Sequence, residues 1–331
     1  MEVTSRECNP DFLTEAGAAI QASYRPPPVG RRSGRGLVEA SAPRRIPPLC
    51  VRLGWSRWLR EPSPFETCPM PANPPEKTAL TSGKLHGLRA IVTGASTGIG
   101  KAVALALASA GASVGVHYGS SKSLAEKVSA ECSTLGGASF AVGRDLSSAE
   151  GLDEWVGQLW NDGPIDVWIN NAGVDLLTGS AREWTYSQKL ESLFAVDLRA
   201  SMLLSKAVGA RMKARGRGVI LNIGWDQAER GMEGDSGELF AAIKGAVMCF
   251  SRSLACSLAP EVRVNCIAPG WIRTAWGEAA SDIWQQRVLR ETPLARWGEP
   301  QDIARLAVFL ASDDADYLTG QVINANGGAI R

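Results

Sequence analysis

The feature that most constrains the fold is a regular alternation of short apolar runs and helical stretches that starts near residue 88. Runs typical of buried strands begin at 89, 113, 139, 165, 219, 264 and 321, and helical patterns separate them, including long ones over about 186–214 and 239–258. Strands that alternate with helices imply right-handed crossovers and a parallel sheet covered on both faces. No repeat of 20–50 residues is present. We therefore expect an α/β, doubly wound parallel sheet.

Composition divides the chain into two parts. Residues 1–83 hold 13 of the 18 Pro and ten Arg, and they show no sustained helical or strand period. Such a segment buries too little apolar surface to offset its ordering entropy, so it is predicted to be a disordered extension. A targeting peptide or basic arm is a weaker alternative, and a true start at Met70 is a third. Residues 84–331 are long enough for a single domain with one substantial core.

Charge and cysteine usage exclude several classes of protein. Lys and Arg number 35 against 34 Asp and Glu, so the chain has no electrostatic footprint for nucleic acid or an anionic membrane. No apolar run approaches the roughly 20 residues of a membrane-spanning helix, and the N-terminus does not read as a secretory signal. Seven single Cys and two His disfavour zinc and a disulfide framework, so a reducing, cytoplasmic location is expected.

A glycine-rich turn follows the first predicted strand and opens the next helix, over residues 93–100. Gly94 permits a tight turn, Gly98 allows a pyrophosphate to approach the backbone, and Gly100 allows close packing of helix and sheet. The helix N-terminus adds free N–H donors and a partial positive charge. This context predicts a Rossmann-like dinucleotide site, although the turn alone would leave a ligand-free glycine turn as an alternative.

Five motifs in order identify a family resemblance. They are the 93–100 turn, Asp145 after the third strand, Asn170-Asn171-Ala172-Gly173, Lys244 in a long helix, and residues 269–274. In these motifs the chain from about 84 to 331 resembles the short-chain dehydrogenase/reductases, especially β-ketoacyl-carrier-protein reductases and bacterial glucose dehydrogenases. The resemblance implies an oxidoreductase that interconverts hydroxyl and carbonyl groups with NAD or NADP. It covers none of residues 1–83.

The resemblance also implies which residues bind the cofactor. Asp145 would accept from the adenine amino group, Lys244 would bind the nicotinamide ribose, and the Ile272 backbone with Thr274 would hold the carboxamide. A solvated loop acid is the alternative for Asp145, and a helix N-cap is a second role open to Thr274. The complete predicted set is Gly94, Ser96, Thr97, Gly98, Ile99, Gly100, Tyr118, Asp145, Leu146, Asn171, Ala172, Gly173, Lys244, Pro269, Gly270, Ile272 and Thr274.

The end of the second strand bears on NAD against NADP. An acid there usually binds the ribose 2′-hydroxyl of NAD, but this chain reads His117-Tyr118-Gly119-Ser120-Ser121-Lys122. Lys122 and the two Ser could serve a 2′-phosphate. Thr97 argues in the other direction, because NADP enzymes of the family often carry Arg at that position. We expect a preference for NADP, with NAD as the alternative.

The catalytic end departs from the family pattern. The family uses Asn, Ser and Tyr-x-x-x-Lys: the Tyr is the general acid, the Lys lowers its pKa, and the Ser orients the carbonyl. Here Asp197, Trp225 and Phe240 occupy the first three positions, and only Lys244 is kept. Trp225 and Phe240 cannot perform those roles, which leaves Lys244 and Asp197 as the predicted catalytic residues of an atypical active site.

Two functions from different classes remain open. The chain is an oxidoreductase on a small carbonyl or hydroxyl substrate, an acyl thioester among the candidates, or a cofactor-binding pseudoenzyme that serves as a regulatory or scaffold subunit. For the enzyme, there are three alternative proton donors: a water molecule held by Lys244, the Asp197 carboxyl, or an acid of the loop from Trp225 to Phe240, called the altered loop below. Plain surface charge is the better reading of any single one of these loop acids, which are Asp226, Glu229, Glu233 and Glu238.

Two further expectations come from the second half of the chain. Four Trp of the predicted substrate lobe, together with Trp225, suggest an aromatic pocket, with packing inside the lobe or across a subunit contact as an equal alternative. Arg273 is expected to be solvated. The two long helices, with small residues on the second, predict a homo-oligomer, with a tetramer expected. The four Trp are Trp271, Trp276, Trp284 and Trp297.

Overall fold

The central element is one sheet of seven parallel strands in the order β3-β2-β1-β4-β5-β6-β7. The computed structural model describes residues 83–331, and the predicted extension therefore lies, except for Gly83, outside the described residues. The sheet confirms the predicted α/β class. Its strands are β1 (Arg89–Val92), β2 (Ser113–Tyr118), β3 (Phe140–Gly143), β4 (Val167–Asn170), β5 (Gly218–Ile223), β6 (Val262–Pro269) and β7 (Val322–Ala325).

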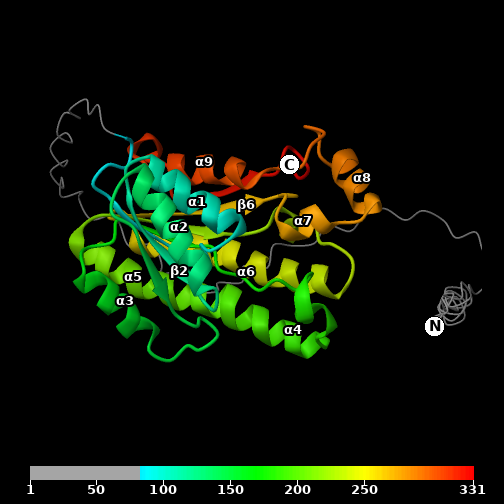
Figure 1. Ribbon diagram of the computed structural model, residues 1–331, viewed down its shortest axis with the longest axis horizontal. Helices are drawn as coiled ribbons and strands as arrows, with labels where there is room; N and C mark the ends of the chain where they lie inside the picture. The colour runs from blue at the N-terminus through cyan, green and yellow to red at the C-terminus, as the bar shows by residue number, and fades with distance from the viewer. Residues whose placement is uncertain (1–82) are drawn as a thin grey trace, which may run out of the picture. The chain divides into compact units, whose positions relative to one another are not determined.

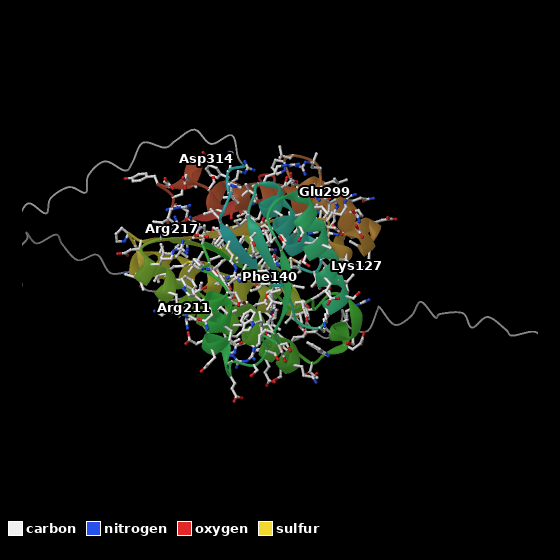
Figure 2. All side chains as sticks on the ribbon, turned by 60° about the vertical axis from the view of Figure 1, so that its left-hand side comes forward. Lys127, Phe140, Arg211, Arg217, Glu299 and Asp314 are labelled. Carbon is white, nitrogen blue, oxygen red and sulfur yellow. The ribbon has the colours of Figure 1, made fainter. Side chains whose placement is uncertain are left out.

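Helices cover both faces of the sheet, as the alternating pattern predicts (Figure 1). On one face, α1 (Gly98–Ser109), α2 (Lys122–Leu135) and α9 (Pro300–Ala311) bury an Ala-, Val- and Leu-rich cluster. On the other, α3 (Leu152–Asn161), α5 (Ser201–Arg215) and α6 (Asp235–Leu258) form a second core around Trp168. Charged side chains such as Lys127 and Glu299 lie at the periphery (Figure 2). Burial on both faces explains why the strands read as continuous apolar runs.

The strand order reverses between β1 and β4, which are hydrogen-bonded neighbours. The chain first builds outward from β1 to β3 and then returns to β4 on the other side of β1. In open α/β sheets, ligands bind at the carboxyl ends of the strands where the order reverses. The glycine-rich turn follows β1, and Asn171 follows β4, so both sequence motifs meet at this point.

Three features of the helices were not predicted. Two short helices, α7 (Ala275–Ala279) and α8 (Asp282–Glu291), follow β6 and carry two of the four clustered Trp, Trp276 and Trp284. The long helix after residue 186 consists of α4 (Tyr186–Leu193), a π-helical turn η3 (Phe194–Ala200) and α5. Turns with i→i+5 hydrogen bonds inside α-helices occur often at functional sites. Asp197, a predicted catalytic residue, lies within such a turn.

Helix α6 is, by length and composition alone, apolar enough to cross a membrane. The core helix of a soluble protein passes the same test. Here α6 packs Leu254, Ala255 and Leu258 into the core beneath the sheet. Its apolar character is therefore explained by burial against β5 and β6.

Candidate functional site

The glycine-rich turn has the shape of a ligand cradle. Gly94 and Gly98 both adopt a positive φ, +61° and +55°. A Cβ on Gly94 would lie 2.7 Å from the Ala172 Cα, and one on Gly100 would lie 2.2 Å from the Gly94 carbonyl oxygen, so internal packing demands both glycines. A Cβ on Gly98 would meet only the Thr274 Cγ2, at 3.7 Å. The open side of Gly98 therefore leaves room for a ligand at the N-terminus of α1.

Thr93 and Asn171 hold this turn against the end of β4. The Thr93 Oγ1 accepts the backbone N–H of Asn171 at 2.9 Å and of Ala172 at 3.0 Å. The Asn171 Nδ2 donates back to the carbonyl oxygens of Thr93 and Gly94, each at 3.0 Å. These reciprocal bonds fix the turn before any ligand binds, which reduces the ordering cost of binding.

His117 is a member of the site that sequence reasoning missed. Its Nδ1 accepts the Gly94 N–H at 3.1 Å, and its Nε2 lies 2.9 Å from the Arg144 carbonyl oxygen, which assigns the proton to Nε2. Burial lowers the pKa of His117 to about 4, so the ring is neutral at physiological pH. The only sequence signal was a polar ring inside an apolar strand, and a satisfied core histidine produces the same signal.

Three other residues of the predicted cofactor set, Tyr118, Asp145 and Leu146, lie at the end of β2 and after β3. The Tyr118 ring covers Gly143, where a Cβ would come within 2.7 Å of it. Asp145 is exposed, and its Oδ1 accepts the Ser147 N–H at 2.8 Å, a bond that lowers the pKa of this carboxyl. Leu146 is instead buried in the core. Lys122 begins α2, and its Nζ lies 3.8 Å from the Glu126 carboxylate.

The segment after β6 approaches the cradle from the other side. Pro269 ends the strand, and the Gly270 N–H donates to the Ala325 carbonyl at 3.2 Å. The Thr274 N–H donates to the Ile272 carbonyl at 2.8 Å. Thr274 occupies the N-cap position of α7 without a side-chain capping bond. Its hydroxyl is therefore not used to cap the helix, and Thr274 lies opposite Gly98.

Lys244 and Asp197 form a buried ion pair at the catalytic end. The Lys244 Nζ lies 3.0 Å from the Asp197 Oδ1, and the two side chains are 6% and 0% exposed. The Nζ also donates to the Ile223 carbonyl at 3.3 Å. The other carboxylate oxygen, Asp197 Oδ2, accepts the Val174 N–H at 2.9 Å. The structure thus brings together the two residues predicted to be catalytic.

Trp225 and Phe240 pack against each other beside this pair. Their ring centroids are 5.3 Å apart at 76°, an edge-to-face contact, and the Lys244 Nζ lies 5.4 Å from the Phe240 centroid. No Tyr within residues 83–331 forms a hydrogen bond with Lys244. The ammonium therefore faces the aromatic ring of Phe240, the residue that the sequence analysis predicts at the position of the family's Tyr.

The acids of the altered loop divide into two kinds. Glu229 and Glu233 are exposed and pair with Arg252 and Arg287, at 3.5 and 2.5 Å, and Glu238 is also exposed, as surface charge predicts. Asp226 is wholly buried, so surface charge is the wrong reading for it.

The Asp226 carboxyl is held away from bulk water. Its Oδ2 accepts from the Asn326 Nδ2 at 3.0 Å, and burial raises its pKa to about 6. These contacts direct the carboxyl toward the segment after β7.

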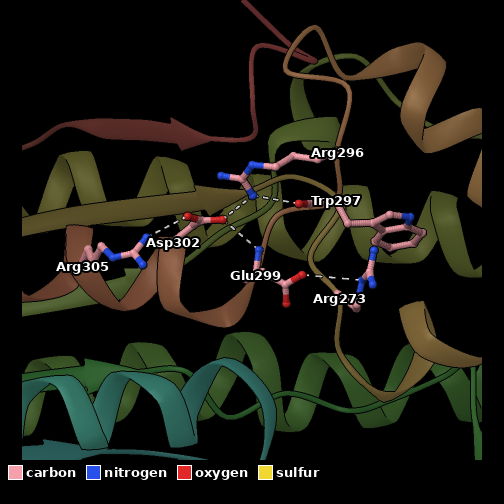
Figure 3. Close-up of polar contacts among 6 residues, drawn as sticks. All are labelled: Arg273, Arg296, Trp297, Glu299, Asp302 and Arg305. Carbon is pink, nitrogen blue, oxygen red and sulfur yellow. Dashed lines mark hydrogen bonds and ion pairs between the residues drawn. The ribbon is translucent and has the colours of Figure 1, made fainter.

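The four Trp of the lobe pack on one another, with centroids of contacting rings 5.4–6.0 Å apart. Arg287 stacks over Trp284 at 4.7 Å. This agrees with packing inside the lobe, one of the two expectations. Arg273 is half-exposed and lies 3.6 Å from Glu299 at the start of α9 (Figure 3).

The described part of the chain offers no metal site. Within residues 83–331, no group of three or more His, Cys, Asp or Glu side chains could hold a metal ion. The four cysteines of this region are all free.

The parallel sheet and the glycine-rich turn at its switch point define a Rossmann-like α/β protein. Comparison with known proteins makes this specific. The family model described as enoyl-(acyl carrier protein) reductase matches residues 94–329. The chain belongs to the short-chain dehydrogenase/reductase family of oxidoreductases.

The alignments with individual relatives extend over nearly the whole length of each relative. A 3-oxoacyl-[acyl-carrier-protein] reductase of Staphylococcus aureus is 35% identical over 246 residues, 72% of this chain and 96% of the relative. An uncharacterized oxidoreductase of Methylorubrum extorquens is 39% identical over 253 residues, 74% and 98% of the two chains. A gluconate 5-dehydrogenase of Burkholderia cenocepacia, solved with NADP and tartrate, is 28% identical with a TM-score of 0.67, covering 74% of this chain and 96% of its own.

Proposed function

We propose that the protein is an NADP-preferring oxidoreductase that interconverts a carbonyl and a hydroxyl group of a small molecule, as 3-oxoacyl-[acyl-carrier-protein] reductases do, with an atypical catalytic site. The observation that carries the proposal is the cradle. Gly94 and Gly100 are demanded by packing, whereas Gly98 faces open space beside Thr274. The positive φ of Gly98, +55°, itself favours glycine, and the open side of this residue is where a pyrophosphate would approach the backbone.

Several features support NADP over NAD. No acid stands at the end of β2, where an Asp or Glu would bind the 2′-hydroxyl. Ser120, Ser121 and the exposed Lys122 lie there instead, at the start of α2. The related gluconate 5-dehydrogenase was solved with NADP. Titration with NADPH and NADH tests this: tighter binding of NADPH is expected, and failure to bind either at millimolar concentration rejects the proposal.

The proposed chemistry separates hydride transfer from proton transfer. The bound dinucleotide supplies or accepts the hydride. The substrate oxygen must gain or lose a proton. The side chains of Phe240 and Trp225 carry no group that acts as an acid or a base near neutral pH. Lys244 remains, held by Asp197 at 3.0 Å, and a water molecule would connect its Nζ to the oxygen. Since a positioned general acid contributes roughly 10²–10⁴ in rate, a water-mediated route is expected to be slow.

A second function is favoured by a specific observation. The edge-to-face contact of Trp225 and Phe240 places two large rings at the positions that would otherwise contact the carbonyl. A pseudoenzyme that binds the dinucleotide and serves as a regulatory or scaffold subunit would retain the cradle and fill this space. Binding of NADPH without turnover of any carbonyl would support this second function.

The decisive experiment joins binding to turnover. NADPH affinity is measured first, and NADPH oxidation is then followed with a panel of carbonyls that includes β-keto thioesters. Slow turnover abolished by Lys244→Met supports the enzyme. Binding with no turnover across the panel supports the pseudoenzyme. We further propose that the protein is a cytoplasmic homo-oligomer, with a tetramer expected from its two long helices.

A further inference from the structure

Lys244 and Asp197 form the most deeply buried ion pair within residues 83–331. Their side chains are 6% and 0% exposed, and no other described residue forms an ion pair with either. The Cys266 thiol also lies near the ammonium, and burial raises its pKa to about 12, so it stays neutral. The pair itself consists of one cation and one anion, and its net charge is zero.

The fold holds the Asp197 carboxylate in place from three directions. The π-helical turn η3 presents it, and its Oδ2 accepts the Val174 N–H at 2.9 Å. A Cβ on Gly173 would lie 2.7 Å from its Oδ1, so only glycine permits this close approach. The Asp197 carboxylate is thus held in a fixed position within η3. It is not a mobile surface acid.

The two redox states of a nicotinamide dinucleotide differ by one charge on the ring. The oxidised ring carries a positive charge, and the reduced ring carries none. A lone ammonium near the ring would repel the oxidised form. An adjacent carboxylate cancels most of that repulsion, and buried charges are screened little by solvent. The family pattern has a neutral Asn at this position, so Asp197 changes the local charge from positive to neutral.

We propose that Asp197 sets the redox-state specificity of the dinucleotide site by raising its affinity for the oxidised form relative to the reduced form. The proposal rests on the proposed function, because it requires that the site bind a nicotinamide dinucleotide. Asp197 acts here through Lys244, as the residue that neutralises and positions its ammonium at 3.0 Å.

A series of charge variants tests the proposal. The measured quantity is the ratio of the dissociation constant of NADPH to that of NADP⁺, from calorimetric titrations. Asp197→Asn makes the local charge positive and is expected to lower the ratio about tenfold, the size of a 1.36 kcal/mol electrostatic change. Lys244→Met leaves a lone anion and should raise it by about the same factor. The double variant restores neutrality and should return to the wild-type ratio.

A merely structural role makes a different prediction. If Asp197 only supports the fold or orients Lys244, the variants weaken NADPH and NADP⁺ equally and the ratio does not move. That result overturns the proposal. The matched control is Asp153→Asn, which removes a carboxylate from an exposed ion pair with Arg211 and should leave the ratio unchanged.

Two measurements keep the test decisive if one variant unfolds. Asp197→Asn leaves a buried ammonium unpaired and can destabilise the protein strongly, so thermal unfolding is recorded for each variant. Comparison of Lys244→Met with the double variant still changes one charge, and equal ratios there overturn the proposal. A wild type that binds neither form rejects the proposed function as well, whereas binding of both with a constant ratio rejects this inference alone.

Discussion

Phe240 is the residue whose replacement most directly tests the catalytic site. Phe240→Tyr would place a phenol beside Lys244, whose Nζ lies 5.4 Å from the ring centroid. Trp225 contacts the same ring, so the double change Trp225→Ser with Phe240→Tyr is expected to exceed either single change. We expect the double variant to oxidise NADPH with β-keto thioesters roughly 10²–10⁴ times faster than the wild type.

The control for this prediction is Phe250→Tyr. It adds a phenol to the same helix, α6, but on a side chain that packs against the core around Trp168. It should leave turnover unchanged. Two outcomes contradict the prediction: a wild type that already turns over at an ordinary rate of about 1–10³ s⁻¹, or a double variant that binds NADPH yet stays inactive on every carbonyl.

Asp226 makes stability depend on pH. Burial raises its pKa from 3.8 to about 6, so between these values the folded state binds more protons than the unfolded state. The free energy of unfolding contributed by Asp226 therefore falls as the pH rises through this window. Asp226→Asn removes the effect, and its free energy of unfolding should gain about 2 kcal/mol relative to wild type between pH 4 and 7.

Denaturant unfolding at several pH values measures this gain. The difference between the two proteins cancels the contribution of His117, whose lowered pKa acts with the opposite sign. Glu229→Gln, which alters an exposed acid of the same loop, should show no such trend. Parallel stability curves for wild type and Asp226→Asn would show that the burial of this carboxyl does not shift its titration.

Two glycines at the start of helix α1 are expected to affect different properties: Gly98 affects cofactor binding, and Gly100 affects folding. An alanine at Gly98 meets only the Thr274 Cγ2 at 3.7 Å, although its φ of +55° costs about 1 kcal/mol. We expect Gly98→Ala to fold and to lose NADPH affinity, because its methyl group fills the cradle. Gly100→Ala should instead lower the melting temperature sharply, since its Cβ collides with the Gly94 carbonyl.

Thermal unfolding and NADPH titration of the two variants distinguish these effects. Gly98→Ala with wild-type affinity would mean that the open side of the turn does not hold the pyrophosphate. Gly100→Ala that unfolds at the wild-type temperature would contradict the packing argument for that glycine.

The outer faces of α4, α5 and α6 bear on assembly at the scale of the whole molecule. Exposed apolar side chains include Leu190 on α4, Phe194 on the turn η3, and Met202 and Leu203 on α5, and Ala242 is exposed on α6. We expect sedimentation of the wild type to show a tetramer and Ala242→Arg to shift it to smaller species, because a charge would be buried in the contact. Ala149→Arg, on an exposed loop, is the control; a monomeric wild type at micromolar concentration contradicts the prediction.

The extension also belongs to this scale. Residues 1–83 show no core pattern in the sequence, so removal of residues 1–69 is expected to leave the melting temperature and the NADPH affinity unchanged. The truncated and full chains are compared in the same buffer. A large fall in melting temperature on truncation would mean that the extension contributes to the fold.

Local patterns carried most of the architecture. All seven strands and the predicted helices lie within a few residues of their expected positions, because a parallel sheet buried on both faces produces apolar runs that differ from helical periods. Helix α7 was missed because it has only five residues, and α8 because its sequence is largely polar and buries a single side chain, Val288. The π-helical turn was missed because its side-chain pattern continues that of the flanking helices.

The sequence by itself determined the fold class and the glycine-rich turn after β1, since each depends on residue type in a short segment. Only the tertiary structure decided which charges meet. Asp197 and Lys244 come from different helices and pair at 3.0 Å, His117 supports Gly94, and Asp226 is buried. Partners and burial depend on contacts between distant segments, and no local spacing encodes them.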